Sequence, residues 1–65
     1  MMPGDLVVLE NGSEFLVEDN EPIFDIKGFY FVHFLVSRSN YASNILEGIT
    51  VEEINILAVG NYDGG

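Results

Sequence analysis

The 65-residue sequence contains no cysteine, no tryptophan and only two basic residues, Lys27 and Arg38. Without cysteine the chain can form neither disulfide bonds nor thiolate metal sites, which stabilise many domains of this size. This absence favours a cytoplasmic location. A chain this short buries about 60% of the surface that it exposes when unfolded, so contact with a partner or with a second copy would add to its stability.

Long hydrophobic runs are missing as well. The longest apolar stretch, Phe29 to Val36, is interrupted by His33 and is too short to cross a bilayer. The first residues lack the basic and apolar regions of a signal peptide. A content of 48% hydrophobic residues nevertheless predicts that the chain folds, because disordered acidic chains are far less apolar.

Negative charge dominates what is present. Eleven acidic residues give a formal net charge of -9. Charge of this sign repels nucleic-acid phosphates and anionic membranes, which argues against direct binding to DNA, RNA or a membrane. The sequence instead predicts a protein partner with a basic surface.

The clearest local pattern is a pair of apolar runs, residues 5–10 and 13–18, on either side of Asn11-Gly12. Asn and Gly tolerate the positive φ angles of a two-residue type I′ turn, so the pattern predicts a β-hairpin. In that register Val8 lies opposite Phe15, and alternation along the strands defines the core face. The predicted core face consists of Leu6, Val8, Phe15 and Val17.

Short strands and loops are predicted for the rest of the chain. Thr50-Val51-Glu52-Glu53 has the form of a capping box, which predicts one helical turn before the last strand. The fold class that follows is mostly all-β: a small SH3-like five-stranded barrel over residues 1–60, with residues 61–65 as a flexible tail. The expected segments are an acidic loop at 18–22, a strong strand at 29–36, a polar loop at 38–44, a short strand at 45–46 and a last strand at 55–59.

The two ends of the chain carry a resemblance to a known family. Residues 4–9 with Gly12, Phe15 and Val17, and later residues 51–57, resemble small bacterial SH3-like barrel proteins of the YodC-like type. The resemblance implies a fold rather than an activity. It skips the middle of the chain, where the basic, tryptophan-bearing strand of that family is absent.

Residues that could carry chemistry are few. His33 is the only histidine, and no serine, carboxylate or second ligand stands at a spacing that would complete a catalytic or zinc site with it. The carboxylates near Glu18 do not match the spacing of an EF-hand loop. The sequence therefore predicts no enzyme, no cofactor and no metal site, and it predicts a structural or interfacial role for His33.

The terminal Gly64-Gly65 supports an alternative function. A chain of about this length that ends in Gly-Gly resembles the ubiquitin-like, β-grasp sulfur carriers, whose terminal carboxylate is adenylated and converted to a thiocarboxylate. That fold requires an amphipathic helix after the first hairpin, so the structure of residues 19–28 discriminates between the carrier and the barrel. Pro22, Gly28 and the lack of a helical period argue against a helix there.

The main hypothesis is a non-catalytic protein-interaction module whose acidic surface binds a basic partner. One version is a phage-type or accessory regulator that mimics a nucleic acid. The residues predicted to bind the partner are Glu18, Asp19, Glu21, Tyr30 and Tyr41. A homodimer is a further prediction, because both faces of the strand at 29–36 are apolar, and the residues predicted to join two chains are Phe29, Phe31, His33 and Leu35.

Overall fold

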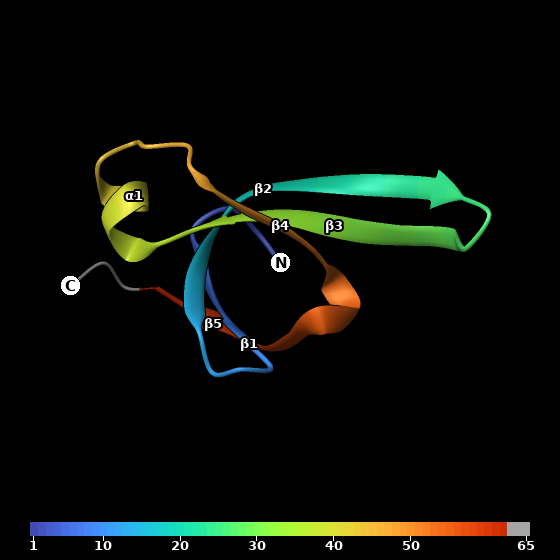
Figure 1. Cartoon of the computed structure of the whole chain (residues 1–65), viewed down its shortest axis with the longest axis horizontal. Helices are drawn as coiled ribbons and strands as arrows, with labels where there is room; N and C mark the ends of the chain where they lie inside the picture. The colour runs from blue at the N-terminus through green and yellow to red at the C-terminus, as the bar shows by residue number, and fades with distance from the viewer. Residues whose placement is uncertain (63–65) are drawn as a thin grey trace.

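The computed structural model describes residues 1–62 as an antiparallel five-stranded sheet with two short helical segments (Figure 1). The strand order is β4-β3-β2-β1-β5, so β4 and β5 form the edges and the sheet of the described residues is not closed. The mostly β prediction and the helical turn before the last strand are confirmed. The elements are β1 (Asp5–Leu9), β2 (Glu14–Asp25), β3 (Gly28–Val36), α1 (Arg38–Ala42), β4 (Gly48–Glu52), the 3-10 helix η1 (Glu53–Asn55) and β5 (Ile56–Asn61).

The first hairpin forms as predicted, but its register is one residue different. The loop has three residues, because the N–H of Gly12 donates to the carbonyl of Leu9 and the N–H of Leu9 donates to the carbonyl of Ser13. Only Gly12 adopts a positive φ there, at 85°, whereas a type I′ turn would also require one at Asn11. The longer loop pairs Val7 with Phe15, so the prediction that Val8 faces Phe15 is wrong.

The core face of β1 changes with this register, whereas Phe15 and Val17 of β2 stay on the core face as predicted. A shift of one residue moves every side chain of a strand to the opposite face of the sheet. Val7 is fully buried and packs with Val17 and Leu35, whereas the predicted core residues Leu6 and Val8 are only partly buried. The partly buried residues packed against this cluster are Leu9, Phe15, Val51 and Ile56.

A second buried pair lies on the other face of the sheet. Leu16 and Val36 are both fully buried and are directly paired in the register of β2 and β3. The helix α1 contacts β2 as well. Strands that are apolar on both sides are therefore buried on both sides in this part of the sheet.

The predicted acidic loop at residues 18–22 is wrong, because these residues continue β2. The strand runs to Asp25, and its pairing with β3 extends through Asp25 opposite Gly28. The ends of β2 and β3 form a long hairpin arm that projects from the rest of the molecule (Figure 1), which gives the molecule extents of 40 × 21 × 18 Å. Pro22 is tolerated because it lies in the two-stranded arm, where β2 pairs with β3 on one side only and is largely exposed.

A bulge between Val17 and Asp19 determines where the acidic side chains of the arm point. Val17 pairs with Leu35 and Asn20 pairs with His33, so one extra residue lies in β2 at this point. Without the bulge, alternation would direct Asp19 and the following odd-numbered residues toward the core face. The bulge instead places Asn20 on the core face and leaves Asp19 exposed.

The second half of the chain differs from the prediction in three places. Residues 38–44, predicted as a loop, contain α1, because the Ser37 Oγ accepts a hydrogen bond from the Asn40 N–H (3.1 Å) and so caps the helix. Residues 45–46 form no strand, and β4 starts at Gly48. The predicted capping box is wrong: Thr50 lies in β4, and η1 begins at Glu53 without a side-chain cap.

The last strand extends beyond its predicted end. β5 pairs with β1 through Asn61, which lies opposite Asp5, so the sheet includes the first residue of the predicted tail. The ring of Tyr62 packs against the ring of Tyr41 in α1, at 6.4 Å between centroids. None of the helices in residues 1–62 has the length and apolar character needed to cross a membrane.

Candidate interaction groove

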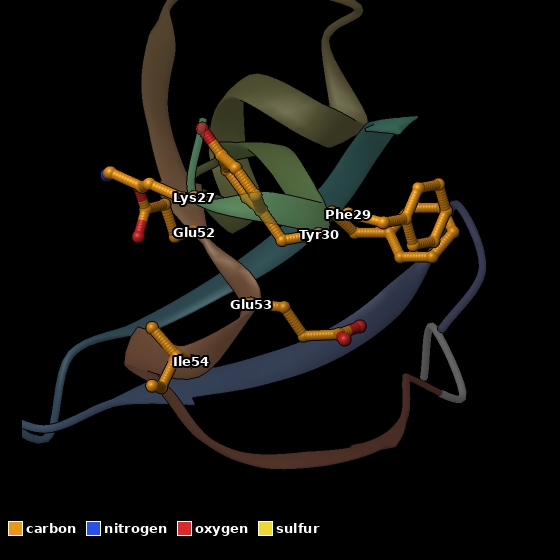
Figure 2. Close-up of a pocket in the computed structure, with 7 residues that line it drawn as sticks. Lys27, Phe29, Tyr30, Glu52, Glu53 and Ile54 are labelled. Carbon is orange, nitrogen blue, oxygen red and sulfur yellow. The ribbon is translucent and has the colours of Figure 1, made fainter. Parts of the chain in front are cut away.

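A groove with a volume of about 570 Å³ lies between the hairpin arm and η1 (Figure 2). Strand β3 forms one side, and the end of β4 and the start of η1 form the other. We call this site the arm groove. Its lining residues are Lys27, Phe29, Tyr30, Phe31, Glu52, Glu53 and Ile54.

One side of the arm groove is polar and is organised by Lys27. The Lys27 Nζ donates a hydrogen bond to Glu52 Oε1 (3.0 Å) and lies 5.6 Å from the centre of the Tyr30 ring. The Tyr30 hydroxyl donates to Asp25 Oδ2 (2.8 Å). The hydrogen bond with Glu52 raises the pKa of Lys27, and the hydrogen bond with Asp25 raises the pKa of Tyr30. Both groups therefore keep their protons up to more alkaline pH than isolated side chains do.

Exposed apolar side chains from β3 and from η1 make up the rest of the groove lining. Phe29 and Phe31 pack edge to face with 5.1 Å between their ring centres. Phe29 is 61% exposed and Ile54 is 84% exposed. On the neighbouring strand, Phe24 lies directly opposite Phe29 and is 85% exposed. Large apolar side chains at such exposure are typical of surfaces that bind another molecule.

The charged residues of the groove lining are two carboxylates, Glu52 and Glu53, and one cation, Lys27. Lys27 is paired with Glu52, and the only other basic side chain, Arg38, is paired with Glu14 at 3.0 Å. Both cations of the chain are thus already matched by a carboxylate, and no other acidic side chain of residues 1–62 forms an ion pair with lysine or arginine. A basic ligand would meet little electrostatic opposition here.

His33 forms the buried end of the arm and is only 1% exposed. Its Nδ1 makes a short hydrogen bond with Asn20 Oδ1, and its Nε2 lies 3.3 Å from Glu53 Oε1. The Nε2 atom has no hydrogen bond of good geometry. Glu53, predicted to cap a helix with Thr50, instead points toward this ring. In residues 1–62, no group of three or more His, Asp or Glu residues is arranged to hold a metal ion.

The residues predicted to bind a partner do not form one surface. Asp19 and Glu21 are exposed on β2, beside Val32 and Phe34 of β3. Tyr30 lies in the arm groove, whereas Tyr41 lies in α1 at the far end of the molecule (Figure 1). Glu18, the fifth predicted residue, is half-buried and is the extra residue of the bulge in β2.

The residues predicted to join two chains are divided between the core and the surface. His33 and Leu35 are buried within the single chain. Phe29 and Phe31 line the arm groove, so they are the two members that a second chain could reach. Self-association stays a prediction. Gly64 and Gly65, named for the carrier alternative, lie outside the described residues.

Sequence reasoning missed Lys27 and Glu52 on the polar side of the groove, although it named Tyr30 as a partner-binding residue. The contact of Lys27 with Glu52 spans 25 positions in the sequence. A periodicity argument cannot detect such a pair. The exposure of Ile54 could have been predicted from the sequence. A single helical turn in which both neighbours of the isoleucine are polar, Glu53 and Asn55, has no apolar face to bury.

Comparison of the chain with protein-family models, with curated proteins and with solved structures finds no match. The resemblances to YodC-like barrels and to sulfur carriers therefore stay predictions.

Proposed function

We propose that this protein is a non-catalytic interaction module that binds a basic segment of a partner protein in the arm groove. One observation carries the proposal: exposed apolar side chains line a groove that is rimmed by carboxylates, on a chain whose two cations are already paired. Apolar contact supplies affinity at such surfaces, and complementary charge supplies selectivity and a fast association rate.

The apolar groove also favours a protein segment over mimicry of a nucleic acid. A phosphate mimic needs carboxylates spread over its contact surface, whereas here exposed Phe29 and Ile54 line the groove and exposed Phe24 lies opposite Phe29. A regulator that acts by mimicry would have to bind elsewhere, for example along Asp19 and Glu21. We further propose that the bent sheet is an SH3-like barrel, which the strand order and the 3-10 turn before β5 support.

The carrier alternative gains no support from the described residues. Residues 19–25 belong to β2 and residues 26–27 form its turn into β3, where a β-grasp carrier requires a helix. We therefore base the proposed function on the groove and not on the chain end.

A displayed library of random short peptides tests the proposal. The full chain is immobilised and the selected peptides are sequenced. We expect enrichment of lysine or arginine together with aromatic or branched apolar residues, and binding that weakens as salt is added. Selection of acidic peptides, or no selection at all, would overturn the proposal.

Two pairs of variants locate the binding site. Glu52→Gln removes a carboxylate from the groove, and Glu14→Gln removes an equivalent one from the other exposed ion pair, away from the groove. We expect Glu52→Gln to weaken peptide binding about fivefold, equivalent to about 1 kcal/mol, and Glu14→Gln to leave it unchanged. Ile54→Ser is expected to weaken binding about tenfold, whereas Leu46→Ser, at an equally apolar exposed position outside the groove, is not.

A further inference from the structure

Strand β3 has an unpaired edge beside the arm groove. β4 pairs with β3 only over Val32–Val36, and the last pair is Val32 opposite Glu52. The chain then turns into η1. Residues 28–31 of β3 therefore pair with β2 on one side and with no strand of the described chain on the other. In an antiparallel sheet, alternate residues direct both their N–H and their C=O to the same side, so part of this segment presents backbone donors and acceptors to the open side.

The arm groove lies at this unpaired edge. Neighbouring residues of a strand point to opposite faces, yet Phe29, Tyr30 and Phe31 all line the groove. A cavity that touches three consecutive residues must span both faces and therefore lies along the edge of the strand. Figure 2 shows the side chains of Tyr30 and Phe29 pointing in different directions from β3, with Glu53 and Ile54 across from them.

Lys27 occupies one end of this space. Its side chain reaches from the turn of the arm across the Tyr30 ring to Glu52, the residue at which β4 stops pairing. A lysine beside a free edge is a common protection against unwanted strand pairing. The contact also shows that a cation fits between the Tyr30 ring and the Glu52 carboxylate, which is the position that a basic side chain of a ligand would take.

We propose that the partner segment binds as an added β-strand along residues 28–31 of β3, in line with β4, and that one of its basic side chains replaces Lys27 at Glu52. This inference rests on the proposed function and specifies how the basic segment binds. Backbone hydrogen bonds to the edge supply affinity that does not depend on sequence, and alternate side chains of the segment reach the two faces. Apolar side chains of the added segment then contact Phe29, Phe31 and Ile54. The groove therefore selects an extended segment with alternating apolar and basic residues.

The backbone of the ligand gives the most direct test. A peptide selected from the random library is prepared with a single N-methyl group at each position in turn. We expect methylation to abolish binding at alternate positions over the central residues and to be tolerated between them, because only every second N–H of an added strand faces β3. Amide hydrogen exchange of the protein is expected to slow within residues 28–31 when the peptide is added.

Three results separate the inference from the proposed function. If peptides bind but methylation shows no alternation, or if exchange slows along the free edge of β5 instead, the added-strand inference is wrong while the interaction module stands. If the bound peptide is helical, the same conclusion follows. If no peptide binds, the proposed function fails and the inference fails with it.

Lys27 gives an independent test with a matched control. Lys27→Gln removes the side chain that competes for Glu52, so we expect the selected peptide to bind about threefold more tightly. Arg38→Gln breaks the other exposed ion pair, at α1, and is expected to leave binding unchanged. Weaker binding by Lys27→Gln would show that Lys27 is part of the contact, which would overturn the displacement step.

Discussion

Individual side chains in the arm are held by partners that lie far away in the sequence. His33 is buried between Asn20 of the neighbouring strand and Glu53 of η1, and it therefore links the arm to the segment that forms the opposite side of the groove. The aromatic density of β3 predicted the strand but gave no sign of this link. Only the bulge in β2, which changes the face on which Asn20 lies, brings the two side chains together.

The hydrogen bond between Asn20 and His33 is expected to contribute to stability. Asn20→Ala leaves the buried Nδ1 without its partner, and we expect a loss of about 1–3 kcal/mol in the free energy of unfolding. The double variant Asn20→Leu/His33→Leu removes both polar groups and is expected to recover most of that loss. Urea unfolding measures all three proteins. A double variant less stable than Asn20→Ala would show that the contact of His33 with Glu53 matters more.

Tyr30 provides a prediction about pH. Its pKa in the folded chain is raised above the ordinary value of about 10 because the hydroxyl donates to Asp25. A raised pKa means that the contribution to stability is fully present below about pH 10 and is lost as the pH rises through the folded value. The difference in tyrosinate absorbance between the wild type and Tyr30→Phe isolates this titration. We expect its midpoint above 10, and closer to 10 in Asp25→Ala.

At the scale of elements, the first hairpin shows how far the sequence could predict the fold. Asn11-Gly12 correctly marked the turn, but the same dipeptide suits a two-residue type I′ loop and a three-residue loop with glycine last. The two loops differ by one residue in register, so with Phe15 and Val17 of β2 on the core face in both, they place opposite side chains of β1 in the core. The burial of Val7 in place of Val8 follows from packing against Leu35, a residue from another strand, which no local pattern contains.

The positive φ of Gly12 leads to a prediction for this hairpin. A side chain is unfavourable in the left-handed region, so Gly12→Ala is expected to lower the free energy of unfolding by about 1 kcal/mol, although a Cβ there would meet no other atom. Gly60→Ala is the matched control, since Gly60 lies in β5 without a positive φ and is equally open. Equal stability of the two variants in urea would contradict the assigned loop.

The arm marks the limit of sequence prediction for β2. Acidic residues and Pro22 between two strands are typical of a loop, so the sequence predicts a loop at residues 18–22. Pairing with the aromatic strand β3 overrides this local preference. Pro22 lies opposite Phe31 in a two-stranded arm, where one side of β2 has no neighbouring strand. A missing N–H on that side costs no hydrogen bond of the sheet. The groove could not be foreseen either, since it depends on where β4 leaves β3.

At the scale of the whole molecule, a small core leaves much apolar surface uncovered. Among residues 1–62, five hydrophobic residues are fully buried, whereas large hydrophobic side chains are exposed at the arm, at η1 and along both edge strands. The exposed residues are Met1, Met2, Phe24, Ile26, Phe29, Ile45, Leu46, Ile49, Ile54, Leu57 and Val59. Either a foreign partner or a second copy of the chain could cover the groove. The net charge of -9 makes the two complexes differ in their response to salt, because the chain attracts a basic partner but repels its own copy.

Salt is expected to act in opposite directions on these two complexes. Added salt screens charges beyond about 10 Å at 0.1 M, so it weakens attraction between the acidic groove and a basic peptide but also weakens repulsion between two chains of charge -9. We therefore expect the Kd of a selected peptide to rise with ionic strength, while self-association strengthens in sedimentation equilibrium. Phe29→Ser reduces the apolar contact in both complexes and is expected to weaken both. A chain that remains monomeric at low and high salt, up to millimolar concentration, would contradict the homodimer. Peptide binding that is insensitive to salt would show that apolar contacts alone select the partner.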